Sequence, residues 1–261
     1  MQKFKINVLF VILFSFFVNA QISKPNQTII VDYDIVLNDT TDIESSQYAF
    51  RYQLNSNGIQ SFQNLQSYID TTLYDKDGFP HEFDSAPINK LNYFKDLSEN
   101  KVIYGSAYNF RKSGKITDSL QFNFINGKAT KTILGYECKQ LIVSFRGRDY
   151  EVFYSTALSE YQDGPWKFAN APGLILAVKS FDNSVTMVAN CIQYSQDIDI
   201  KSCPKSWDKR LALSYREFVE KRSSWRDNVK AKIRAEDPMS DISIPYRNFE
   251  IYHPYYIDNH R

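Results

Sequence analysis

The feature that most constrains the fold is a succession of short runs rich in Val, Ile, Tyr and Phe that begins at residue 28. Clusters of Asn, Asp, Gly and Ser bound these runs, as turns bound antiparallel strands. The 15% share of aromatic residues also favours strands over a helical bundle. Strands are predicted over residues 28–37, 48–54, 101–112, 115–125, 129–145, 148–156, 174–181 and 185–195. We therefore expect a mainly β protein, an antiparallel open sheet or half-barrel of about eight strands, with a meander as its simplest topology.

Alternation along these runs indicates that only one face of each strand is apolar. Tyr150, Val152 and Tyr154 point to the same side of their strand. The other face needs either water or a covering element. The expected cover is one long C-terminal amphipathic α-helix over residues 205–235, with Ser206 as its N-cap. Its apolar stripe recurs at steps of three, four or seven residues and consists of Trp207, Leu211, Tyr215, Phe218, Trp225, Val229 and Ile233.

The same segment is strongly basic. Residues 205–234 contain ten Lys or Arg against four Asp or Glu, a net charge of +6. A basic amphipathic helix can bind anionic lipid, but it can also pack on its own sheet and leave a charged face in water. Charged outer faces are ordinary in packed helices, so we expect packing, through Trp207, Leu211, Phe218 and Trp225.

The N-terminus has the features of an export signal. Lys3 and Lys5 precede a mostly apolar run over residues 8–18, and Ala20 is a small residue at a cleavage position. The run is shorter than the roughly 18 residues that span a bilayer, so a signal peptide over residues 1–20 is predicted. After cleavage we expect a periplasmic or secreted protein that does not span the membrane. Its parts would be a β domain over residues 21–204, the basic helix, and an extended tail over residues 236–261.

No motif points to a particular reaction. The patterns G-x-S-x-G and H-E-x-x-H and the P-loop are absent from the sequence. The formal net charge of +1 disfavours nucleic acid as a partner. His81, His253 and His260 share no ligand spacing with any cysteine, so neither a metal nor a cofactor is expected.

These observations favour a binding or interaction module over an enzyme. Two alternatives stay open at this point. One is a hydrolase-like periplasmic enzyme that lacks a recognisable motif. The other is a carrier of an apolar ligand, which would need an aromatic-lined cavity in the concavity of the sheet.

One loop departs from ordinary strand-and-turn composition, namely D-G-P-W-K-F-A-N-A-P-G-L-I-L over residues 163–176. Pro165 and Pro172 restrict the backbone, so the loop is expected to be stiff. Trp166 and Phe168 are unfavourable to leave exposed. The loop is either a structural plug that closes one end of the sheet or a preorganised surface for a partner.

Several motifs around this loop occur together. They are G-Y-E-C at residues 135–138, F-R-G-R-D-Y at 145–150, G-P-W-K-F at 164–168 and P-G-L-I at 172–175. In combination they resemble the GLPGLI family of exported Bacteroidetes proteins, also called the Porphyromonas gingivalis-type family. The resemblance covers roughly residues 101–195 and implies export and a shared loop, but no activity. The name-giving hexapeptide departs here at Asn170 and Ala171, and Asn tolerates the left-handed backbone that Gly adopts.

A disulfide is expected because exported proteins usually pair their cysteines. The chain has Cys138, Cys191 and Cys203 after the predicted signal peptide. The pair Cys138–Cys191 is predicted, with Cys203 free, since both lie in predicted strands and members of the family are similar in carrying a second cysteine after the motif loop. The pair Cys191–Cys203 is the main alternative, because it closes a short loop.

The candidate partner-binding site combines the loop with the arginines of the preceding turn. Trp and Arg are enriched at interaction hot spots, and the combination suits an acidic or aromatic group on a partner. The expected partner is an envelope or outer-membrane protein. The predicted contact residues are Arg146, Arg148, Gly164, Pro165, Trp166, Phe168, Pro172 and Gly173.

Overall fold

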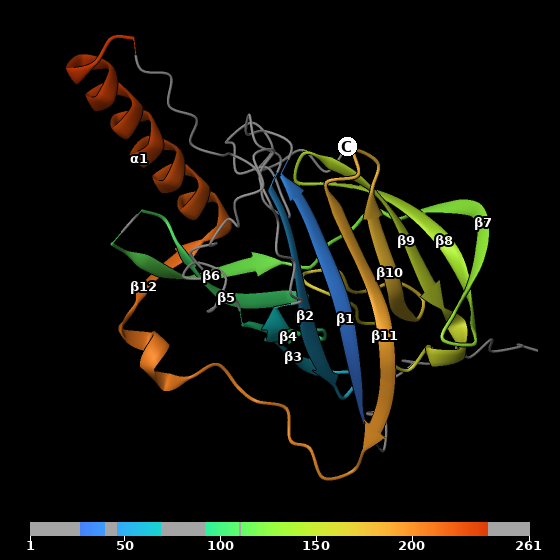
Figure 1. Ribbon diagram of the computed structural model, residues 1–261. Coiled ribbons are helices and arrows are strands. Elements are labelled where there is room, and N and C mark those ends of the chain that lie inside the picture. Colours follow the sequence, from blue (N-terminus) through green and yellow to red (C-terminus); the bar gives the residue numbers. More distant parts are fainter. Residues whose placement is uncertain (1–26, 40–45, 69–91, 110, 240–261) are drawn as a thin grey trace, which may run out of the picture.

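The computed structural model describes residues 27–39, 46–68, 92–109 and 111–239 (Figure 1). Within these ranges the protein is mainly β, with one C-terminal helix at an open sheet of twelve strands. The predicted signal peptide and most of the predicted tail lie outside the described residues. In the described part of the chain, no helix is long and apolar enough to cross a bilayer.

The sheet consists of two antiparallel meanders. The first contains β1 (Thr28–Asp39), β2 (Ser46–Ser56), β3 (Gln60–Tyr68), β4 (Tyr93–Asp96), β5 (Lys101–Ala107) and β6 (Ser113–Ser119). The second contains β7 (Ile125–Ile133), β8 (Tyr136–Phe145), β9 (Arg148–Ser155), β10 (Leu174–Ser180) and β11 (Val185–Ser195). The strand β12 (Leu211–Ser214) adds to β6 in parallel orientation. The described sheet therefore ends in β7 on one side and β12 on the other (Figure 1).

The two meanders join where β1 pairs with β11. Ile35 lies opposite Phe50 of β2 on one side and Met187 of β11 on the other. Ile29, Val31, Tyr33 and Ile35 are buried, and the residues between them are partly exposed. This alternation places the apolar face of β1 on the main core, as the period of two predicts.

The expectation of about eight strands is wrong, because the sheet has twelve. β3 and β4 were not predicted. The predicted strand over residues 129–145 is a hairpin that turns at Leu134 and Gly135, whose φ angles are 51° and 83°. The fourth additional strand, β12, lies inside the segment predicted to be helical.

The predicted helix is also shorter than expected and begins later. A 3-10 helix, η3 (Lys205–Lys209), and β12 precede the α-helix α1 (Tyr215–Glu236). Trp207 packs on Phe94 with ring centroids 5.5 Å apart, and Leu211 is 47% exposed on β12. Trp207 and Leu211 are therefore not part of a helical stripe, because the strand interrupts the period of 3.6.

The start of α1 is set by a capping box at Ser214. The Ser214 hydroxyl accepts a hydrogen bond from the Glu217 backbone N–H at 3.3 Å, and the Glu217 carboxylate accepts from the Ser214 backbone N–H at 2.7 Å. Phe218 and Val219 in the first two turns are fully buried. The helix contacts β12 and β6 and extends past that edge of the sheet rather than across its broad face (Figure 1).

Replacing Ser214 by Ala should lower the free energy of unfolding by about 1 kcal/mol, because one capping hydrogen bond is lost. Urea denaturation followed by circular dichroism would measure the change. Replacement by Gly should cost only a few tenths of a kcal/mol. Equal stability of Ser214→Ala and the wild type would show that the cap does not hold the helix.

The predicted disulfide is not formed, and all three cysteines are free. Cys138 lies on β8 and Cys191 on β11, with β9 and β10 between them. Neighbouring strands are about 4.8 Å apart, so three steps separate the two cysteines by about 14 Å. A disulfide requires Cα atoms within about 7 Å. The alternative pair, Cys191–Cys203, is not bonded either.

Candidate functional site

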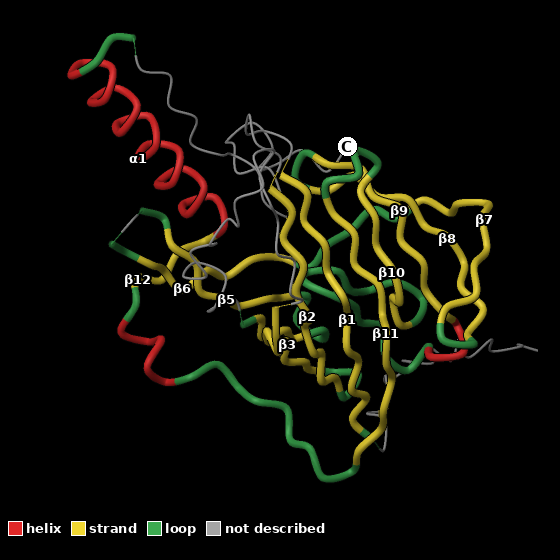
Figure 2. The backbone as a smooth tube through the Cα atoms, viewed as in Figure 1, coloured by secondary structure: helices red, strands yellow, loops and turns green. Residues whose placement is uncertain are grey.

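The motif loop fills the concave side of the second meander. After β9 the chain forms the short 3-10 helix η2 (Thr156–Leu158), and residues 159–173 then return behind the strands to begin β10 (Figure 2). The loop is closed by a bridge between Asp163 and Ala169 and by the bond from the Ile175 N–H to the Asp163 carbonyl at 2.8 Å. The loop therefore covers the concave face of the second meander, whereas α1 contacts β12 and β6 of the first.

Two positions in the loop have a residue type suited to their backbone. A Cβ atom on Gly173 would lie 2.0 Å from the Ser155 carbonyl oxygen, so the backbone can approach β9 this closely only at glycine. Asn170 has a φ of 62°, the left-handed conformation that Asn tolerates. Its side-chain amide donates to the Leu120 carbonyl at 2.9 Å, which fixes the turn.

The aromatic side chains of the loop are buried. Trp166 is 2% exposed and Phe168 is fully buried. Phe168 packs on Tyr150 with ring centroids 5.1 Å apart, and both Trp166 and Phe168 pack on Phe145. The burial and packing of these rings support the interpretation of the loop as a structural plug.

A buried ion pair holds the base of the loop. The Lys95 ammonium on β4 donates to the Asp163 carboxylate at 2.7 Å and to the carbonyls of Gly164 and Phe168 at 2.6 and 3.1 Å. The side chains of Lys95 and Asp163 are both fully buried. Burial lowers the pKa of Lys95, and Asp163 opposes that shift. Three acceptors match the three donors of an ammonium, so the first meander is bonded to the loop of the second.

A second buried cluster lies beside the first turn of α1. Asp118 on β6 pairs with Arg146 at 2.8 Å and with the Lys167 ammonium at 2.9 Å. Lys167 also donates to the Tyr104 hydroxyl at 3.1 Å, and the Arg146 guanidinium lies 3.7 Å from the centre of the Tyr215 ring. Burial raises the pKa of Asp118, but Lys167 and Arg146 outweigh it and hold the pKa below its usual value.

The two arginines of the predicted site point to different places. They flank a tight turn in which Arg146 and Gly147 have φ angles of 52° and 81°. Arg146 is bonded to Asp118 near α1, whereas Arg148 pairs with Asp182 in the turn between β10 and β11. Both arginines are buried. Arg146 lies close to the loop through Lys167, which shares the carboxylate of Asp118.

Prediction from sequence missed the partners of the loop. Lys95, Tyr104 and Asp118 lie on strands of the first meander, far from the loop in sequence. No spacing rule connects such residues. Lys167 gave one signal, since a lysine between Trp166 and Phe168 has to find a partner if its neighbours are buried.

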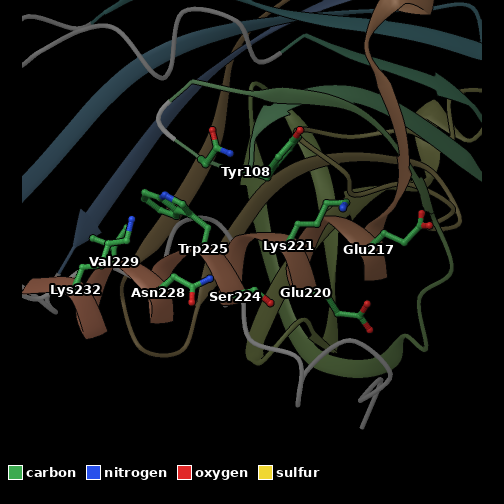
Figure 3. A pocket seen from close by; sticks show the side chains of 10 residues that line it. Tyr108, Glu217, Glu220, Lys221, Ser224, Trp225, Asn228, Val229 and Lys232 are labelled. Carbon is green, nitrogen blue, oxygen red and sulfur yellow. The ribbon is translucent and has the colours of Figure 1, made fainter. Parts of the chain in front are cut away.

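A groove of about 650 Å³ lies outside the core, along α1 (Figure 3). Tyr108 and Asn109, which follow β5, face one side of the helix across it. The helix contributes Trp225 and Val229 together with polar and charged side chains. These other lining residues are Glu217, Glu220, Lys221, Ser224, Asn228 and Lys232. The groove therefore offers aromatic rings and both signs of charge on one surface.

No family model matches the chain, and no curated protein matches its sequence. Two solved structures of PNGF-II are similar, each with a TM-score of 0.45, at 15% and 18% identity. The similarity covers 78% and 75% of this chain but 33% and 34% of PNGF-II, so the chain spans about a third of that protein's length.

Two shorter structures are similar over most of their own length. A putative outer membrane lipoprotein-sorting protein domain from Vibrio parahaemolyticus has a TM-score of 0.31 and 9% identity, over 67% of this chain and 88% of that one. A LolA superfamily protein from Nitrosomonas europaea has a TM-score of 0.25 and 10% identity, over 70% and 90%. At these scores none of the similarities assigns a function.

Proposed function

We propose that the chain is an exported cell-envelope protein that acts as a binding module for another envelope protein, and that the groove along α1 is its contact surface. The main support is the filled interior. Trp166, Lys167 and Phe168 are buried where a ligand in the concavity would have to lie. This occupancy disfavours a carrier of apolar ligands and favours a contact on the outside.

The lining of the groove supports a protein partner. Trp and Tyr are enriched among residues that carry binding energy, and Trp225 and Tyr108 line opposite sides of this groove. The capping box and the buried Phe218 hold the first turns of α1 in place. A contact surface that is already ordered loses little conformational entropy on binding.

Replacing Trp225 by Ala should reduce capture of the envelope partner by about tenfold or more, as expected for an aromatic anchor. The measurement is quantitative pull-down from the envelope fraction, with each variant first checked for a cooperative thermal unfolding transition. Phe181→Ala is the matched control, because Phe181 is 56% exposed in the turn between β10 and β11, outside the groove. Full capture by Trp225→Ala, or equal loss in Phe181→Ala, would reject the groove.

The same pull-down also tests the contact residues that were predicted from sequence around the loop. If the groove is the contact surface, Arg148→Ala should capture the partner as well as the wild type. Loss of capture in a folded Arg148→Ala protein would instead favour the eight residues predicted from sequence. Their role in binding stays a prediction.

Membership of the GLPGLI family belongs to this proposal as well. The support for this membership is that several motif residues have backbone conformations or close contacts that few residue types tolerate. Gly135 and Gly147 have φ angles of 83° and 81°, Gly173 touches the Ser155 carbonyl, and Asn170 takes the left-handed conformation.

A further inference from the structure

The basic segment seen in the sequence is concentrated at one flank of the folded protein. η3, β12 and α1 follow one another along the edge of the sheet opposite β7 (Figure 1). From residue 205 to residue 236 there are ten Lys or Arg against five Asp or Glu. The hairpin between β5 and β6 adds Arg111 and Lys112, which are both exposed.

Contacts between distant parts of the chain hold this flank together. Lys115 on β6 pairs with Asp208 of η3 at 2.7 Å. The Arg222 guanidinium on α1 donates to the Ala107 carbonyl at the end of β5 at 2.9 Å. Arg111 and Lys112 lie in the hairpin that connects β5 to β6. The hairpin, η3 and α1 therefore form one continuous surface, which we call the basic flank.

Much of the acidic charge on the basic flank already has a local partner. Asp208 accepts from Lys115, and Glu217 accepts from the backbone and hydroxyl of Ser214 in the capping box. Asp227 lies 3.5 Å from the Arg226 guanidinium. The excess is positive, and among its exposed carriers are Arg111, Lys112, Lys205, Lys209, Lys221 and Lys232.

Exposed apolar side chains accompany these cations. Leu211 on β12 is 47% exposed, directly after Lys209 and Arg210, and Met239 beyond the end of α1 is 92% exposed. Each Lys or Arg near an anionic bilayer adds attraction, and neighbouring apolar side chains can enter the interface. A soluble acidic polymer would be attracted by the positive charges, but Leu211 and Met239 would add little to its binding free energy.

We propose that the basic flank docks on the surface of an anionic phospholipid membrane. The attachment is peripheral, since the buried face of α1, with Phe218 and Val219, stays in the protein core. This docking goes beyond the proposed function. Lys221 and Lys232 line the groove and also belong to the basic flank, so the docking is tested at Lys205 and Lys209, which lie outside the groove.

The test is sedimentation of the chain with vesicles of phosphatidylglycerol and phosphatidylcholine, compared with vesicles of phosphatidylcholine alone. Binding is expected to the anionic vesicles only and to disappear in about 1 M salt, where the Debye length is about 3 Å. The double variant Lys205→Glu, Lys209→Glu should lower the partition coefficient at least about tenfold. Leu211→Ser should lower it severalfold without changing its salt dependence.

The matched control is Lys128→Glu, Lys139→Glu, which makes the same change of charge at exposed positions on β7 and β8. This control should bind as the wild type does, and a thermal melt checks that every variant is folded. The proposal is overturned if the wild type does not bind anionic vesicles. It is also overturned if the control loses as much binding as the Lys205→Glu, Lys209→Glu variant. Retention on heparin without vesicle binding would also overturn it and would assign the flank to an acidic polysaccharide.

Discussion

The Trp166→Ala variant is expected to be less stable than the wild type by about 3–5 kcal/mol, the usual cost of deleting a buried Trp side chain. Trp166 of the motif loop packs on Phe145 of β8 and on Phe168. Its removal therefore leaves a cavity that the surrounding strands do not close. Chemical denaturation would measure the change. Phe181→Ala serves as the control and should change stability by less than about 1 kcal/mol, since Phe181 is largely exposed. A Trp166→Ala protein as stable as this control would mean that the loop does not fill the core.

A loss of similar size, about 3–5 kcal/mol, is expected for Asp118→Asn, which keeps the shape of the side chain but removes its charge. Arg146 and Lys167 would then be buried without their shared carboxylate. Asp208→Asn is the matched control, because Asp208 pairs with Lys115 at the surface and such pairs contribute at most about 1 kcal/mol. If both variants lose equally little, the buried cluster does not hold the two meanders together.

The same cluster sets the direction of a pH effect. The pKa of Asp118 in the folded protein is held below its unfolded value, despite burial, by Lys167 and Arg146. A carboxylate with a lowered folded pKa contributes its full stability above the unfolded pKa of about 3.9 and loses it as the pH falls through the folded pKa. Stability of the wild type should therefore fall below about pH 4, and Asp118→Asn should show a flatter acid limb.

The parts of the fold that were predictable from sequence have strong local patterns. β1 and the first half of β9 alternate clearly, and the turns at Gly147 and Asn183 carry residues that tolerate a positive φ. β3 was missed because its sequence, Q-S-F-Q-N-L-Q-S-Y, is mostly polar. β12 was missed because Leu211 and Tyr215 continue the helical spacing, although pairing with β6 decides the conformation there.

The candidate site was predictable only in part, for a physical reason. Pro165 and Pro172 predict a stiff loop from the local sequence alone. Whether that loop is buried depends on Lys95 and Asp118, which reach it only through the pairing of distant strands. The groove along α1 likewise needs Tyr108 and Trp225 to meet across more than a hundred residues of chain.

The pairing of β1 with β11 also determines the order in which the protein can be assembled. Each meander is made of neighbours in sequence and can form quickly, but Leu37 meets Val185 only after nearly the whole sheet has been synthesised. Until then β1 presents an unpaired, apolar strand edge, the kind of edge that associates with other chains. Formation of this seam is therefore expected to be slower than formation of either meander. A partner that covers this edge of β1 until β11 has formed is expected to raise the yield of folded protein.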